Sequence, residues 1–221
     1  MDPVFYLARH QTDGRFTVFN VDIFGWGPNQ PIAPLSQERR EEKLKPFTEE
    51  WIRQAVSNYE KLRAENGHAA PAHFDHNEDS QETSRDLIGF VTDLKIGDGR
   101  GDVITQTILT PDGFKPAKLM RAGRADRVYA TLRNIPKDTF EKLKEWPYRS
   151  VEVLDPAVPM FSSLAFLRSI PPFFCFRPLV TIVDESETAP DFHFEQSGLE
   201  SVRFAAKKQY FYVQNQHYKY L

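Results

Sequence analysis

Apolar and polar side chains alternate along several short stretches of this chain, which is the pattern of β-strands with one buried face. The first stretch spans residues 4–27, where Asp13 and Gly14 supply a turn. A glycine-rich segment at 97–101 separates two later stretches and predicts that they pair as a hairpin. Beyond the first stretch, strands are predicted at 87–94, 102–109, 127–133, 148–154, 163–167 and 179–183.

Helical periodicity occurs in two segments. Thr48 is a good N-cap, apolar residues recur every three or four positions after it, and Gly67 is a good terminator, so a helix is predicted over 49–66. Pro136 precedes a second, shorter helix over about 137–145. The segments 67–85 and 110–126 show neither period and are predicted to be irregular.

These elements predict an α+β domain over residues 1–185, built on a mostly antiparallel β-barrel that is closed or nearly closed. A parallel α/β sheet would need regular alternation of strands and helices, which is absent. The pattern dissolves after residue 185, so 186–221 are predicted to form a C-terminal tail or arm, with 209–213 as a late strand candidate.

Composition excludes several classes of protein. The chain has 221 residues and a net charge of -3, without the basic excess of a domain that binds nucleic acid by bulk electrostatics. No secretion signal and no apolar run long enough to span a membrane are present. The single cysteine, Cys175, lies among phenylalanines, which favours an inert buried thiol and a reducing compartment.

A candidate nucleophile lies in the predicted strand around position 150. Ser150 and Glu152 project from the same face of that strand, roughly 6.5–7 Å apart, whereas Arg149 projects from the other face. The α/β-hydrolase elbow GxSxG is absent. A serine hydroxyl becomes a useful nucleophile only when a base takes its proton, so the question is which residue supplies that base.

Histidines upstream offer such a base, and three interpretations of them stay open. His73 and His76 lie in the polar segment 71–79. They are solvated loop side chains, or one of them is a base for Ser150, or they bind a metal together with His68 and Asp75. No cysteine lies nearby to complete a metal site.

The order of motifs resembles that of the prohead maturation proteases of tailed phages, especially the Mu-like branch, which are relatives of the herpesvirus assemblins. The resemblance covers about residues 15–185 and depends on the following segments: a helix at 50–59, then 71–76, 88–94, 134–136, 148–153 and 164–167 with a proline pair at 171–172. It implies an assemblin-like fold without a cofactor or bound metal. It also implies a serine endopeptidase that cleaves scaffold and major capsid proteins, and itself, inside the prohead in the host cytoplasm. A homodimer is a further expectation, and neither nucleic acid nor a membrane is an expected partner.

The resemblance also implies roles for single residues. Ser150 matches the nucleophile and His76 the base, with His73 in reserve. Family members carry a glutamate that orients the histidine, but Ser163 occupies the matching position here, so Glu152 and Ser163 are both candidates for the third catalytic member. Arg168, or the backbone near it, is the candidate oxyanion donor. The alternative is a non-enzymatic capsid component on the same fold.

Overall fold

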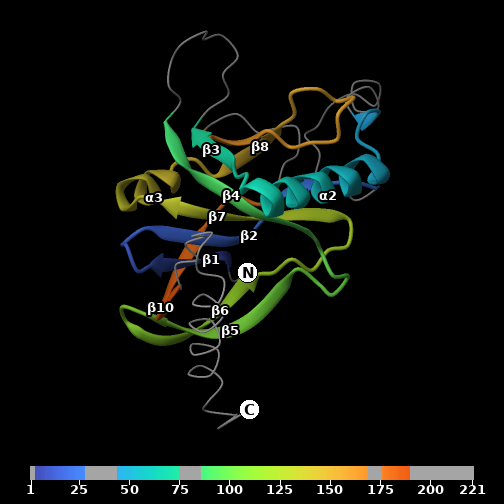
Figure 1. Ribbon diagram of the computed structural model, residues 1–221. Coiled ribbons are helices and arrows are strands. Elements are labelled where there is room, and N and C mark those ends of the chain that lie inside the picture. Colours follow the sequence, from blue (N-terminus) through green and yellow to red (C-terminus); the bar gives the residue numbers. More distant parts are fainter. Residues whose placement is uncertain (1–2, 28–43, 75–85, 169–175, 190–221) are drawn as a thin grey trace, which may run out of the picture. The chain divides into compact units, whose positions relative to one another are not determined.

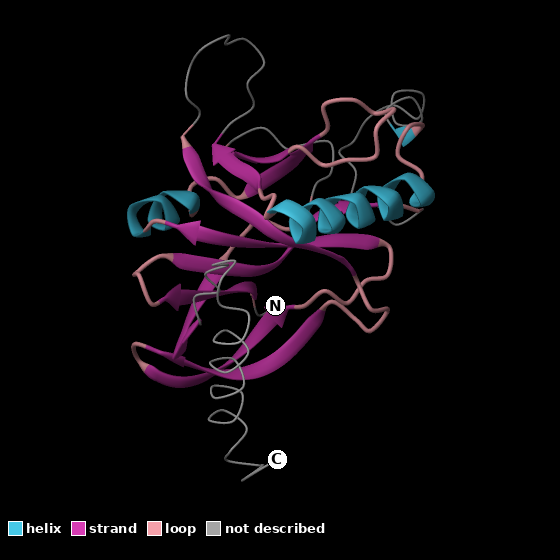
Figure 2. Cartoon of the chain, in the orientation of Figure 1, coloured by secondary structure: helices cyan, strands magenta, loops and turns pink. Residues whose placement is uncertain are grey.

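The computed structural model describes residues 3–27, 44–74, 86–168 and 176–189. Strands predominate, as Figure 2 shows, and the helices with described bounds are α2 (Glu49–Asn66) and α3 (Lys137–Leu143). The strands are β1 (Val4–Gln11), β2 (Phe16–Gly25), β3 (Ala70–Phe74), β4 (Leu87–Ile96), β5 (Val103–Thr110), β6 (Gly113–Met120), β7 (Arg127–Ile135), β8 (Tyr148–Glu152), β9 (Ser163–Leu167) and β10 (Thr181–Ala189).

The chain divides into two compact units, residues 1–188 and 189–221. All elements named here belong to the first unit, apart from the last residue of β10. The predicted late strand at 209–213 and Cys175 lie outside the described residues. In the described ranges no helix is both long and apolar enough to cross a membrane.

The described strands form one ten-stranded sheet in the order β5-β6-β1-β2-β7-β4-β3-β9-β8, with β10 paired to β1. Most pairs are antiparallel, as predicted, while β1 with β6 and β3 with β9 are parallel. The sheet does not close, because its path ends at β5 and β8 and no ladder joins these two strands. The prediction of a closed or nearly closed barrel is therefore wrong.

A physical reason for the open path is found at β8. A barrel needs a continuous backbone ladder between its first and last strands. Here β8 approaches β2 through the side chain of Arg149, which bonds Asp22 on β2. The segment before β10 occupies part of the remaining space, because Leu179 N donates to Pro147 O (2.9 Å) and Tyr6 N donates to Val180 O (2.8 Å). Where β8 comes near β1 and β2, side-chain bonds and a connecting segment thus take the place of a backbone ladder.

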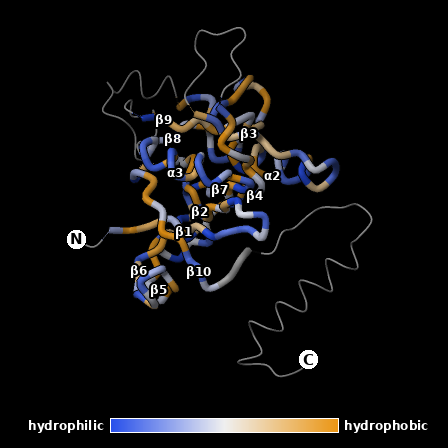
Figure 3. The backbone as a smooth tube through the Cα atoms, turned by 90° about the vertical axis from the view of Figure 1, so that its left-hand side faces the viewer, coloured by the Kyte–Doolittle hydropathy of each residue, from blue (hydrophilic) through white to orange (hydrophobic). Residues whose placement is uncertain are grey.

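Helix α2 covers one face of the sheet and confirms the prediction for 49–66 (Figure 1). The Thr48 side chain accepts a hydrogen bond from Trp51 N (3.2 Å), and Gly67 ends the helix in the left-handed conformation with φ 69°. Its buried face joins a core to which β1, β2 and β7 contribute, and Figure 3 shows apolar positions concentrated there. The buried residues of α2 are Trp51, Ile52, Ala55, Val56 and Tyr59.

Two segments predicted to be irregular are strands, β3 and β6. β3 escapes detection because it has only five residues and its position between β4 and β9 buries all of them except Pro71, so apolar and polar positions do not alternate. β6 escapes detection because most of its first half is exposed on both faces, so this half shows no alternation of buried and exposed residues.

The predicted hairpin between β4 and β5 is also wrong. β4 pairs with β3 and β7, whereas β5 pairs with β6. The glycines at 97–101 serve a close approach of two connections instead of a hairpin turn. A Cβ on Gly97 would stand 2.1 Å from the Arg124 carbonyl oxygen, and one on Gly123 would stand 1.8 Å from the Gly101 carbonyl oxygen.

Candidate functional site

Strand β8 presents Ser150 and Glu152 on one face and Arg149 on the other. In the antiparallel pair with β9, Ser150 lies opposite Ala165 and Glu152 lies opposite Ser163. Residues directly opposite each other share a face of the sheet, so these four side chains lie on the same face. The two-residue spacing seen in the sequence therefore becomes a polar patch shared by two strands.

Strand β3 adds His73 to this face, because His73 lies opposite the same Ala165 from the other side of β9. His73, Ala165 and Ser150 thus form one row across three strands. Neighbouring strands lie about 4.8 Å apart, so the Cα atoms of His73 and Ser150 are separated by roughly 10 Å. Ala165, fully buried between them, is small enough to let the imidazole lean across β9.

The imidazole does cross β9. His73 Nε2 lies 3.2 Å from Glu152 Oε2, and the Ser163 hydroxyl donates a hydrogen bond to the same carboxylate oxygen. His73 is 3% exposed, and Glu152 and Ser163 are half-buried. The Glu152 carboxylate thus orients the buried histidine, as the carboxylate of a Ser-His-Asp triad does. Ser163 in turn holds that carboxylate in place.

On the opposite face, Arg149 anchors β8 to the core. It is fully buried and donates to the Asp22 carbonyl oxygen (2.6 Å), to Asp22 Oδ1 and to the Tyr6 hydroxyl (2.7 Å). Burial alone would lower the pKa of the Arg149 guanidinium, but Asp22 and Tyr6 raise it above its ordinary value, so Arg149 stays charged. Burial also raises the pKa of Tyr6, which donates to Asp22 Oδ1 at 2.7 Å.

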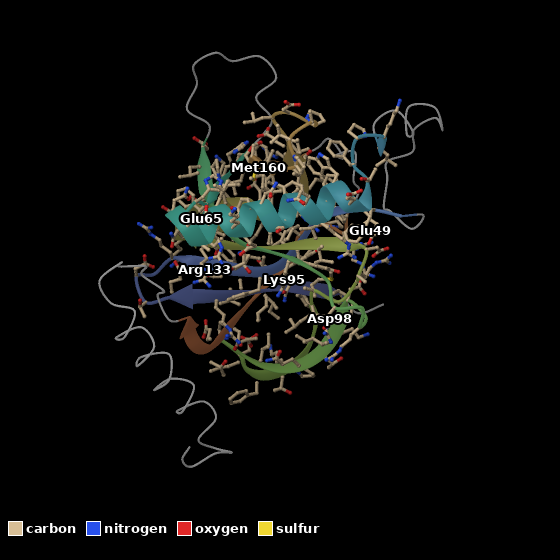
Figure 4. The ribbon with its side chains drawn as sticks, turned by 45° about the vertical axis from the view of Figure 1, so that its right-hand side comes forward. Glu49, Glu65, Lys95, Asp98, Arg133 and Met160 are labelled. Atoms are coloured by element: carbon tan, nitrogen blue, oxygen red, sulfur yellow. The ribbon has the colours of Figure 1, made fainter. Side chains whose placement is uncertain are left out.

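The connection from β8 to β9 is held by the carbonyl of Glu152 and by α2. Ser162 donates to the Glu152 carbonyl oxygen from both its amide (3.0 Å) and its hydroxyl (2.8 Å). Trp51 Nε1 donates to Pro156 O (2.8 Å) and Asn58 Nδ2 donates to Pro159 O (3.0 Å). In Figure 4, Met160 of this connection lies on one side of α2, and Lys95 and Asp98 lie on the other.

An open groove of about 830 Å³ lies against this polar face. Its polar lining consists of His73, Glu152 and Ser163, which contact one another, and of Ser162. Its apolar lining includes Leu154, which is 91% exposed. Ser150 lies on the same face of β8 as Glu152, two residues earlier, but it is not among the residues that line the groove. The groove is lined by Pro71, His73, Leu87, Val151, Glu152, Val153, Leu154, Ser162 and Ser163.

The other predicted site residues lie apart from this cluster or outside the described ranges. His76 and Asp75 belong to the part that the structure does not describe. Arg168 is exposed and its Nη2 lies 3.0 Å from Glu145 Oε2, so the structure gives no support for an oxyanion role. His68 packs edge-on against Tyr59 with ring centroids 5.5 Å apart. Within the described residues no group of three or more His, Cys, Asp or Glu side chains is placed to hold a metal.

Sequence analysis did not place His73 in a strand beside Ser150 and Glu152. The segment 70–74 carries no alternation that would have revealed β3. The bounds of β9 were predicted correctly, and β9 is the strand with which β3 pairs in parallel. The one available signal was therefore that the short apolar segment 70–74 could pair with β9.

Comparison with known proteins gives no relative. No protein-family model matches the chain, and no curated protein and no solved structure matches it significantly. A functional assignment therefore depends on the chemistry of these residues and on the motif order in the sequence.

Proposed function

We propose that this protein is a serine endopeptidase with Ser150 as its nucleophile. The observation that supports it most is the row of His73, Ala165 and Ser150, with the imidazole already leaning across β9 to a residue of β8. In the proposed reaction Nε2 keeps its contact with Glu152, and Nδ1 is the ring nitrogen that takes the Ser150 proton. Apo active sites commonly hold such hydrogen bonds loosely until substrate binds.

The proposed chemistry is acyl transfer. The imidazole takes the Ser150 hydroxyl proton as the oxygen attacks a peptide carbonyl carbon, and then gives that proton to the leaving amine. Water attacks the acyl-enzyme in the second half, giving a free carboxylate and restoring the serine. Glu152 orients the imidazole, while Ser163 holds the carboxylate in place.

Two histidines compete for the role of base. Among the described residues, His73 has the position expected of a base, since its imidazole contacts Glu152. His76 has the motif position that the prohead proteases suggest, three residues further along the chain. Single His73→Ala and His76→Ala variants, each compared with His68→Ala, separate them, because the base is the histidine whose loss abolishes cleavage.

The proposed substrates are the scaffold and major capsid proteins of a phage prohead, cleaved in the interior of the shell. The motif order of the sequence supports this choice. The apolar wall of the groove, formed by residues such as Leu87, Val151 and Leu154, suits an extended peptide with aliphatic side chains.

Loss of the Ser150 hydroxyl is expected to abolish this trimming. The Ser150→Ala variant is co-expressed with the cognate scaffold and capsid proteins, and the products are separated on a gel. Cleavage should fall by at least about 10³-fold, because a dedicated nucleophile is lost. Ser57→Ala, an exposed serine on α2, is the matched control and should cleave normally. Normal trimming by Ser150→Ala would exclude the assignment.

A second candidate is a non-enzymatic capsid component. One observation favours it: His73 contacts Glu152, and Glu152 and Ser163 tie β3, β8 and β9 together as a structural link would. On this hypothesis Ser150→Ala changes neither cleavage nor assembly, whereas Glu152→Ala lowers stability. Comparing these two variants decides between the candidates.

A further inference from the structure

Leu154 is the most exposed large apolar side chain in the described part of the chain. A single exposed leucine needs no explanation in itself, because apolar atoms contribute much of any protein surface. Leu154 differs from such a case because it belongs to the lining of the open groove. The same groove contains His73, a candidate base, and Glu152, the carboxylate that the imidazole contacts.

Apolar side chains lie on both sides of the polar cluster in this groove. Leu87 on β4 lies opposite His73 in the antiparallel pair of β3 and β4, and it is 48% exposed. Leu154 lies just beyond the end of β8, two residues after Glu152. The two leucines thus flank the candidate base and its carboxylate. Apolar walls around a few polar groups are typical of a site that binds a ligand in a defined orientation.

The β8–β9 connection, residues 153–162, holds Leu154 on an anchored backbone. Two side chains of α2 donate hydrogen bonds to the carbonyl oxygens of Pro156 (2.8 Å) and Pro159 (3.0 Å). Both carbonyls belong to prolines, whose rings fix φ and stiffen the connection further. A side chain presented on a backbone that is already ordered loses little entropy when a partner binds, so binding there costs less.

We propose, building on the peptidase function proposed above, that Leu154 determines specificity by contacting an aliphatic side chain of the substrate. Leu154 follows Ser150 by four positions (154 − 150), so their Cα atoms lie at most roughly 14 Å apart. Because an extended peptide advances about 3.3 Å per residue, the substrate side chain that meets Leu154 is about three or four residues from the scissile bond.

The substrate class that follows is a peptide with leucine, isoleucine or valine at that position. Contact between two aliphatic side chains removes apolar surface from water, whereas a serine there gains nothing comparable. Discrimination through one such side chain is expected to be about tenfold. Leu154 therefore chooses among substrates without taking part in the chemistry at Ser150.

Exchanging Leu154 for a charged residue should change which peptides are chosen. Leu154→Lys should replace the aliphatic preference by a preference for an acidic side chain, and Leu154→Glu should select a basic one. Val158→Lys is the matched control, because Val158 is also an exposed aliphatic residue of the β8–β9 connection but does not line the groove. It should keep the aliphatic preference.

Two measurements on the full-length protein use the same library of short peptides of varied sequence. In the first, the Ser150→Ala protein carrying each change captures peptides, and mass spectrometry identifies those that bind. In the second, the protein with Ser150 intact digests the library, and the cut positions are mapped. A switch from aliphatic to acidic side chains in Leu154→Lys, absent in Val158→Lys, supports the inference.

The inference is overturned if Leu154→Lys keeps the preference of the unaltered protein, or if Val158→Lys changes it as strongly. Failure of the peptidase function gives a different result: no variant cuts the library, while capture still switches with the charge at position 154. A library that is neither captured nor cut would contradict both proposals.

Discussion

At the scale of single residues, β8 is organised by what its alternate side chains contact. Ser150 and Glu152 lie on the face that carries His73, while Arg149 points into the core and bonds Asp22 and Tyr6. A charge buried this deeply is tolerated because it is paired and its donors are satisfied. The strand that carries the proposed nucleophile is therefore fixed from behind by an ion pair.

Removal of Arg149 should be far more damaging than removal of an exposed arginine. Arg149→Met leaves the Asp22 carboxylate buried with Arg127 as its remaining cation at 3.2 Å, and should cost about 3–5 kcal/mol of stability. Arg168→Met, at an exposed pair with Glu145, should cost less than about 1 kcal/mol. Urea unfolding measures both. Equal losses in the two variants would show that the buried network contributes no more than a surface pair.

The sequence indicates the two faces of β8 but not the partners on them. A period of two separates Arg149 from Ser150 and Glu152, and the structure agrees. The contact of Glu152 with His73 depends on the parallel pairing of β3 with β9, which brings together residues 79 positions apart in the chain (152 − 73), and the local pattern carries no information about that pairing.

At the scale of elements, Tyr59 connects α2 to the sheet. Its hydroxyl donates to Val91 O on β4 (2.6 Å) and accepts from Ala70 N on β3 (2.8 Å). It is fully buried, so burial raises its pKa to about 12. The helix that braces the β8–β9 connection is thus tied to the strand that presents His73.

Alkaline pH should weaken this connection. The pKa of Tyr59 is raised in the folded state above the ordinary value of about 10, so the folded state keeps the proton longer than the unfolded chain. Its contribution is fully present below about pH 10 and is lost as pH rises toward about 12. Tyr59→Phe should cost about 1–3 kcal/mol at pH 7 and flatten the stability profile above pH 10.

Urea midpoints across this pH range measure the effect. Tyr148→Phe, at a half-buried position on β8, removes a hydroxyl from a different element and is the matched control. An unchanged alkaline slope in Tyr59→Phe would contradict the role given to its hydroxyl.

Elements with strong local signals could be predicted, and those stabilised by distant pairing could not. α2 has a capping threonine, a helical period and a terminal glycine, and its bounds were predicted correctly. β3 has five residues and is a strand because β4 and β9 flank it. β6 becomes visible only as the partner of β5 and β1.

At the scale of the whole molecule, strand order was the least predictable feature. The glycine-rich segment 97–101 has the residues of a good hairpin turn, yet the two strands that it joins, β4 and β5, belong to different parts of the sheet. Closure into a barrel was inferred from the number of short strands, which does not determine whether the first and last strands meet. The side chain of Arg149 and the segment before β10 lie between β8 and the strands β1 and β2 instead.

The open sheet nevertheless brings together residues from three segments that are far apart in the chain. β3, β9 and β8 are adjacent at one end of the path, and the proposed nucleophile, base and carboxylate all come from this trio. The proposal that this end is a peptidase site makes Ser150 chemically different from every other serine in the protein.

Reaction of the intact protein with a fluorophosphonate, followed by mass spectrometry, tests that claim directly. Trypsin cleaves after Arg149 and Arg168, so Ser150, Ser162 and Ser163 share one peptide and fragment ions distinguish them. We expect a stoichiometric adduct on Ser150 that disappears in Ser150→Ala and is lost when the base histidine is replaced. An adduct on a different serine, or none while a known serine peptidase in the same tube is labelled, would contradict the account.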